Sequence, residues 1–302
     1  MTELADGAQP IDDRVAELLE SRALLDELFT DVVAAEGTLA GGTKLGNGGK
    51  ALQTVRECTI SIGNPKDNLI RLTPKLFNSL DIKLTDIWKK QLESDFNFYY
   101  LTLSVSLRSP QGISFESLEC SLDFGPKGHD EPIVQTIFPT SRWRGVLNAE
   151  AGMSVALDGS LGWKVGAAFP LHVGQAKAKL SGSAGASGVI VAGNYSFQIG
   201  HAEISATGEG NSTCFWQLTN PEIRQVQTVD FAVVFKVPAS VSNLSLRALC
   251  VAQPKTSWIV QSLRHVWRGL SDRVRQLLGR GDPTARSILV GDHEMWDLEL
   301  PR

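Results

Sequence analysis

The side chains best suited to chemistry form two short clusters of imidazole and carboxylate. Residues 129–131 are His-Asp-Glu, and residues 292–294 are Asp-His-Glu. Such groups can move protons or bind a metal ion. The five histidines are widely spaced, however, and none forms an HExxH-type pair. Both clusters occur in turn-like or terminal sequence, so we interpret them as solvated polar groups and predict no catalytic residue and no metal site.

A glycine-rich stretch over residues 46–51 fits the GxGxxA pattern of dinucleotide-binding loops. We predict no strand before it and a strand rather than a long helix after it, which is the wrong context for that loop. Lys50 is followed by Ala51, whereas a phosphate-binding P-loop needs Ser or Thr there for magnesium. The pattern favours a flexible linker over residues 37–54 and no cofactor. Without a GxSxG nucleophile elbow, catalysis is also disfavoured.

Cysteine usage and the ends of the sequence bear on location. The four cysteines lie far apart without zinc-ligand spacing, which favours reduced core thiols: Cys58, Cys120, Cys214 and Cys250. The first ten residues lack the basic and apolar regions of a secretory signal, so we expect a cytoplasmic protein. No apolar run approaches the roughly 18 residues of a membrane-spanning helix.

Length and charge exclude further classes. The chain has 302 residues, 42% of them hydrophobic, and 29 basic against 33 acidic residues give a net charge of −4. This composition is that of a soluble globular protein. Nucleic-acid-binding domains are usually basic, so we expect no nucleic-acid partner.

The body of the chain carries the two-residue alternation of half-buried strands. From Tyr99 to Arg108 apolar and polar residues alternate, and similar runs follow at 118–124, 133–138, 214–218, 223–237 and 244–252. Pro, Gly and Asn separate them. The pattern predicts a β-rich body over residues 55–254, most simply an antiparallel sandwich.

Amphipathic helices are predicted at both ends. Apolar residues recur at spacings of three and four within residues 1–36, a segment carrying about −8. Residues 255–302 contain a basic amphipathic helix and a terminal strand; the helix carries about +5 over 255–280, with Arg264, Arg268 and Arg275 on it. We expect the two helices to attract each other and to hold the soluble state closed, and the basic one suits an anionic membrane surface.

The central stretch departs from an ordinary sandwich. From residue 147 to 167 every odd position is apolar or small, which would extend roughly 70 Å as one strand, whereas an ordinary strand has about 5–6 residues. After a turn-like segment, alternation resumes on even positions from Ala176 and then shifts near Gly188 to Val189, Val191, Tyr195, Phe197 and Ile199, as a β-bulge would allow. Residues 147–199 therefore predict a long hairpin or meander. Its membrane-facing candidates are Leu147, Met153, Val155, Leu157, Leu161, Trp163 and Val165.

Two interpretations of this hairpin stay open. In pattern and in its Gly, Ala and Ser content it resembles the stem hairpins of β-barrel pore-forming proteins. That resemblance implies a non-catalytic protein that self-associates and inserts into membranes. Alternatively, the hairpin is one face of a soluble sheet, because half-buried antiparallel strands alternate in the same way. The chain would then be a binding or scaffold module for another protein.

Overall fold

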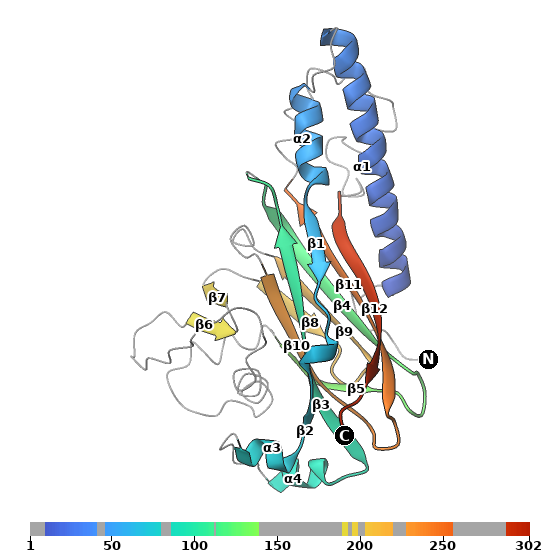
Figure 1. Cartoon of the computed structure of the whole chain (residues 1–302), viewed down its shortest axis with the longest axis vertical. Coiled ribbons are helices and arrows are strands. Elements are labelled where there is room, and N and C mark those ends of the chain that lie inside the picture. Colours follow the sequence, from blue (N-terminus) through green and yellow to red (C-terminus); the bar gives the residue numbers. More distant parts are fainter. Residues whose placement is uncertain are drawn as a thin grey trace.

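The computed structural model describes residues 10–40, 46–79, 86–111, 113–138, 189–192, 195–198, 203–219, 228–255 and 288–302. Within them, two antiparallel five-stranded sheets form the body (Figure 1). The predicted mainly β fold with a helix near the N-terminus is confirmed. The predicted basic helix falls almost entirely within residues 256–287, outside the described residues.

The strands of sheet A run in the order β1-β3-β10-β5, with β2 also paired to β3. Their bounds are β1 Thr59–Ile62, β2 Leu69–Leu72, β3 Phe96–Arg108, β5 Ile133–Phe138 and β10 Thr228–Pro238. Sheet B has the order β12-β11-β4-β9-β8. Its bounds are β4 Phe115–Gly125, β8 Glu203–Thr207, β9 Thr213–Thr219, β11 Asn243–Pro254 and β12 Val290–Glu299.

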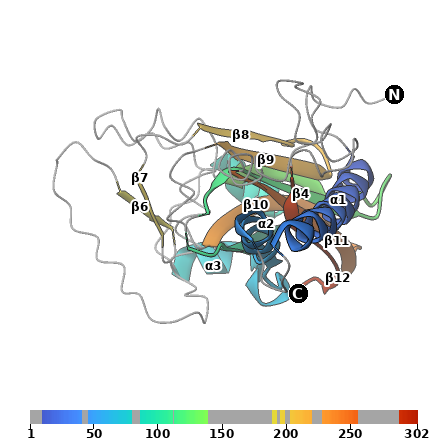
Figure 2. The same cartoon turned by 90° about the horizontal axis from the view of Figure 1, so that it is seen from above.

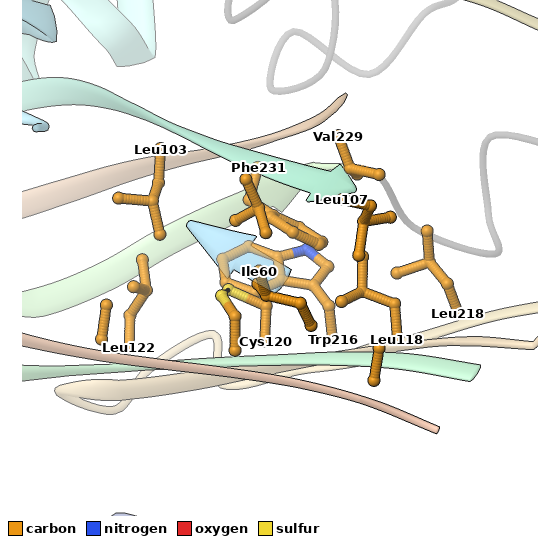
Figure 3. Close-up of a cluster of buried hydrophobic side chains, with 14 of the residues drawn as sticks. Ile60, Leu103, Leu107, Leu118, Cys120, Leu122, Trp216, Leu218, Val229 and Phe231 are labelled. Atoms are coloured by element: carbon orange, nitrogen blue, oxygen red, sulfur yellow. Dashed lines mark hydrogen bonds between the residues drawn. The ribbon is translucent and has the colours of Figure 1, made fainter. Parts of the chain in front are cut away.

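The core lies between the two sheets and follows the predicted alternation. On β3 the odd residues from Tyr99 to Leu107 are buried in the main core, and the inward residues of β10, β4, β11 and β9 meet them. Trp216 is fully buried, with its ring centroid 5.0 Å from that of Phe231 (Figure 3). Burial of each such side chain contributes about 1.5–3 kcal/mol, so this interface is the main source of stability.

Helix α1, Ile11–Ala40, covers the outer face of sheet B. Near its start, Ile11 and Leu18 pack against Leu249 and Val251, which point away from the main core. The Ser21 hydroxyl accepts a hydrogen bond of 2.7 Å from the Leu289 amide, and Arg22 donates to the Gly291 carbonyl. The second half of α1 projects beyond the sheets (Figure 1).

A second helix corrects the prediction of a linker over residues 37–54. Helix α2, Asn47–Arg56, packs on α1, and its Leu52 and Val55 join the main core. The buried Glu36 carboxylate of α1 accepts hydrogen bonds from the amides of Gly48, at 2.8 Å, and Gly49, at 3.0 Å. Glycines disfavour helix locally, but this tertiary cap satisfies their amides. A carboxylate of the chain itself therefore occupies the position that a phosphate would need.

Among the described residues, only one end of the outer face of sheet A is covered. A short 3-10 turn, η1 Lys66–Asn68, leads into β2, and helices α3, Pro74–Ser79, and α4, Asp86–Leu92, follow it. A second apolar cluster lies here: Leu72, Phe77, Phe98, Tyr100, Ala232 and Val234. Tyr100 therefore lies on the outer face and is nevertheless buried, although alternation alone assigns that face to solvent.

Candidate functional site

The predicted hairpin is inserted between two strands at the ends of the two sheets. Residue 138 ends β5, which is an edge strand of sheet A in the described part of the chain. Residue 203 begins β8, which is an edge strand of sheet B there. Strand β5 contacts both β8 and β9, so the two ends of the insertion leave the same side of the sandwich. Residues 139–202 thus connect two neighbouring edges.

The two edges are joined by the backbone at Val134. Its amide donates to the Asn211 carbonyl and its carbonyl accepts from the Gly210 amide, both at 2.8 Å. Residues 208–211 form the turn between β8 and β9, and Gly208 adopts a φ of 129° there. A Cβ at Gly208 would lie 2.4 Å from the Thr213 carbonyl oxygen, so the turn requires glycine. We call the two main sheets on either side of the insertion the frame. Its two flanking edges are therefore joined by contacts that do not involve the insertion.

Within the insertion, the structure describes one two-stranded antiparallel ribbon, β6 Val189–Ala192 and β7 Tyr195–Gln198. It pairs with neither main sheet, and both cartoon views draw it to one side of them (Figures 1 and 2). The pairing of Ile190 with Phe197 and of Ala192 with Tyr195 places these four residues on one face.

This register corrects the predicted odd-position series from Val189 to Ile199. Each pair of opposite residues in this ribbon joins an even-numbered residue to an odd-numbered one. One face therefore holds even-numbered residues of β6 and odd-numbered residues of β7. Val189 and Val191 therefore share a face with Ser196 and Gln198. The predicted bulge near Gly188 and the even-position series that begins at Ala176 lie outside the described residues and stay predictions. The return arm of the predicted hairpin then ends at the turn after Ala192.

The membrane-facing candidates and the basic-helix candidates lie outside the described residues. The first set is Leu147, Met153, Val155, Leu157, Leu161, Trp163 and Val165, and the second is Arg264, Arg268 and Arg275. Both sets stay predictions. Among the described helices, none has the length and apolar character needed to span a membrane.

The acidic helix α1 is held by sheet B through apolar contacts and ion pairs. Asp12 pairs with Arg247 of β11, and Arg14 pairs with Glu119 of β4. The hydrogen bond and the positive charge of Arg247 lower the pKa of the Asp12 carboxyl. Farther along, Arg56 of α2 lies 2.9 Å from Asp26 and 4.4 Å from the ring centroid of Phe29. The partners of α1 in the described residues are thus β4, β11, β12 and α2.

A half-buried carboxyl lies on the outer face of sheet A. Asp230 of β10 is directly opposite Ser104 of β3, whose hydroxyl donates to it at 2.6 Å. Burial raises the pKa of Asp230, and the hydrogen bond from Ser104 partly offsets this. The neighbouring pair of Ser106 and Thr228, with hydroxyls 3.4 Å apart, continues the polar stripe. This half of the face is polar, in contrast to the half covered by α3 and α4.

The sequence reasoning missed one polar cluster because one of its members, Ser212, is distant in sequence from the others. The Lys127 ammonium donates to Asp123 and to the buried Ser212 hydroxyl, both at 2.5 Å, and that hydroxyl donates to Glu131. A Ser–Lys pair resembles a nucleophile with its base. Here, however, Lys127 forms ion pairs with Asp123 and Glu131, and the Ser212 hydroxyl donates to Glu131 and not to Lys127. The cluster therefore ties the turn after β4 to β9.

The two histidine clusters are not assembled into one site. His129 has a 97% exposed side chain and lies 3.2 Å from Asp130. His293 is exposed on β12, while Asp292 accepts a hydrogen bond of 2.9 Å from the Ile62 amide of β1. Asp292 thus has a structural role. In the described part of the chain, no three His, Cys, Asp or Glu residues are grouped as metal ligands.

Comparisons with known proteins gave only distant structural likenesses. No family model and no curated protein sequence matches this chain. The Clostridium perfringens NetB toxin in its membrane-inserted form is 9% identical, with a TM-score of 0.29 over 53% of this chain and 74% of that one. A structure described as a pore forming protein is 8% identical, with a TM-score of 0.31 over 66% and 79%. The C. perfringens delta-toxin is 11% identical, with a TM-score of 0.26 over 65% and 78%. At such TM-scores these likenesses establish no function for this chain.

Proposed function

We propose that this chain is a non-catalytic protein whose central hairpin, residues 147–192, inserts into membranes as part of a pore-forming β-barrel after several copies assemble. The observation that carries the proposal is the uninterrupted alternation over residues 147–167, within an insertion placed between two sheet edges. The distant structural likenesses are not part of this argument.

Both arms of the hairpin are long enough. A transmembrane β-strand needs about 9–11 residues that alternate between lipid and lumen. Residues 147–167 alternate throughout, and residues 175–192 remain for the return arm after the turn that follows Ala192 is taken into account. The small residues on the second arm suit a barrel wall, because a closed barrel needs no strongly apolar run.

Assembly follows from the number of strands. One hairpin supplies two strands, whereas closed membrane barrels have about eight or more. An open sheet edge is not tolerated in the bilayer core, because its backbone groups have no partners there. About four or more copies are therefore needed, and the partner of this chain is another copy of itself.

The frame supports the proposal because it does not depend on the hairpin. The bonds at Val134 hold the two flanking edges together, and the core residues of the described part of the chain lie on strands and helices outside 139–202. Rearrangement of the hairpin would therefore leave the contacts among these described core residues in place. Helix α1 is a different case, because deleting residues 1–36 would uncover Leu249 and Val251. Because such a deletion would damage the fold, it cannot test whether attraction between the two terminal helices holds the soluble state closed.

Release of a self-quenching dye from phosphatidylcholine vesicles, with and without an anionic lipid, tests the proposal on the full chain at micromolar concentration. Two matched pairs of variants place the same charge on opposite faces: Leu157→Lys against Ser160→Lys, and Leu180→Lys against Ser181→Lys. The leucine variants should lose nearly all release, because Lys facing lipid costs about 2–4 kcal/mol at mid-membrane. The serine variants should still release dye.

Three outcomes contradict the proposal. The first is a wild-type protein that releases no dye from either vesicle. The second is equal loss in both members of each pair. The third is a monomer whose hairpin amides exchange slowly and stay protected with vesicles present, as expected for a preformed soluble sheet that binds another protein. Thermal melting of every variant separates failure to insert from failure to fold.

A further inference from the structure

Two cysteines face each other at the centre of sheet B. Cys250 of β11 is directly opposite Cys120 of β4, and their sulfurs are 3.2 Å apart without a disulfide. Directly opposed residues of antiparallel strands have Cα atoms about 4.5–5.5 Å apart, within the range that a disulfide spans. The sulfurs would need to approach by roughly 1.2 Å to reach bonding distance. The pair is therefore already aligned for a cross-strand bond.

The other two cysteines are not placed to compete. Cys214 of β9 is opposite Leu122, so it is only a diagonal neighbour of Cys120. Diagonal positions are about 7–8 Å apart, beyond the reach of a disulfide without backbone movement. Cys58 lies between α2 and β1, outside sheet B. The register thus selects one pair.

The folded protein protects this pair from oxidants. Both side chains are 0% exposed, and Figure 3 shows Cys120 among the buried apolar side chains beneath Trp216 and Phe231. Burial raises the pKa of Cys120 well above that of a free thiol, which disfavours the reactive thiolate. Strands β4 and β11 each pair on both sides. Exposing the thiols therefore requires opening the middle of the sheet.

We propose that Cys120 and Cys250 are a redox modification site whose state is set while the chain folds. A small-molecule disulfide such as oxidised glutathione is the oxidant. One cysteine thiolate attacks it and releases one glutathione thiolate, and the second cysteine thiolate then displaces the other. Two cysteine thiols lose two protons and two electrons to form one disulfide, and one oxidised glutathione becomes two reduced molecules. Once β4 and β11 have paired, the core preserves whichever state was formed.

The bond would close a large covalent ring. Residues 120 and 250 are 130 positions apart, and the ring contains β5, the insertion, β8, β9 and β10. A disulfide that closes a long loop reduces the entropy of the unfolded chain strongly. We expect the oxidised form to melt roughly 5–15 °C above the reduced form.

Refolding provides the test. Full-length protein is unfolded in guanidinium with a reductant and then refolded by dilution into a glutathione–oxidised glutathione buffer; a native reduced sample is incubated in the same buffer. Thiols are counted after denaturation, and peptides are mapped by mass spectrometry. The refolded sample should show two thiols and a Cys120–Cys250 link, while the native sample should keep all four thiols.

Variants and a second preparation keep the test decisive. Cys58→Ala and Cys214→Ala should still oxidise, whereas Cys120→Ala and Cys250→Ala should form no intramolecular bond. If refolding yields are low, protein expressed in the bacterial cytoplasm is compared with protein expressed in the periplasm by the same thiol count. The proposal is overturned if oxidative folding leaves four thiols, if the bond joins other cysteines, or if native protein oxidises as fast as refolding protein.

Discussion

The two sides of the sandwich are closed in different ways. On one side β1 and β12 bridge the sheets, with the Ile62 amide bound to Asp292, and α1 covers the neighbouring strands. On the other side β5 and β8 meet at Val134, and the chain departs between them as residues 139–202. We name these the closed side and the open side. On both sides, the hydrogen bonds that join the two sheets are made by residues outside the insertion.

The largest expected effect comes from removing the insertion altogether. A short Gly/Ser linker in place of residues 139–202 should abolish vesicle dye release, while the free energy of unfolding of the frame changes by less than about 2 kcal/mol. Denaturant unfolding and dye release measure the two quantities on the same sample. If the shortened protein is unfolded, the open side needs the insertion for its stability. That result would contradict the view that contacts outside the insertion hold the two edges together.

Damage to the turn of the open side should be the largest stability effect of a single substitution. Gly208→Ala adds both an unfavourable positive φ and a Cβ close to the Thr213 carbonyl, so it should cost about 3 kcal/mol. Gly128→Ala is the matched control, because Gly128 has a φ of 94° with open space around it. It should cost about 1 kcal/mol. Equal losses measured by urea unfolding would contradict the role of close packing at this turn.

On the closed side, the close approach of α1 to β12 can be tested at Gly291. A Cβ there would lie 2.5 Å from the Cys250 carbonyl oxygen and 3.0 Å from Leu18 Cδ2. Gly291→Ala should therefore cost about 2 kcal/mol by overpacking. Glu294→Ala on the exposed part of β12 should change stability by less than about 0.5 kcal/mol. If Gly291→Ala leaves the free energy of unfolding unchanged, α1 does not pack tightly against β12.

The smallest expected effect concerns Asp230, and it raises stability. Burial raises the pKa of Asp230 in the folded state above 3.8, its ordinary value in the unfolded chain. The wild type therefore loses stability as the pH rises from 3.8 through the folded-state pKa. Asp230→Asn should remove this loss and raise the free energy of unfolding at pH 7 by less than about 1 kcal/mol, while keeping an acceptor for Ser104. Ser104→Ala should act in the opposite direction. Thermal melts at pH 4 and pH 7 compare all three proteins, and a destabilised Asn variant at pH 7 would contradict the argument.

Local pattern predicted the strands well and the contacts between distant elements poorly. Alternation located β5 at its observed bounds and β3, β4 and β11 within a few residues, because one face of each strand is buried. Helix α2 was missed because its glycines are poor helix formers and its cap, Glu36, belongs to another helix. The strand order was also hidden, because pairing partners such as β3 and β10 are far apart in sequence.

The candidate site stays a sequence prediction, and the register of its described ribbon could not be predicted. The predicted hairpin, residues 147–199, falls within the connection from β5 to β8, which spans residues 139–202. Which residues of β6 and β7 share a face depends on which residues pair. The sequence does not decide this, because Val189 and Val191 fit either register. The ties of Lys127 to Ser212 and of Ile62 to Asp292 leave no local signal at all.

The side chains of Ser21 and Arg22 have a consequence for self-assembly. They engage the backbone at Leu289 and Gly291, where β12 begins at the end of sheet B. A backbone already engaged in this way is a poor template for a strand from a neighbouring molecule. Unwanted edge-to-edge aggregation is thereby discouraged at the start of β12, and any ordered growth between molecules must begin elsewhere on the surface.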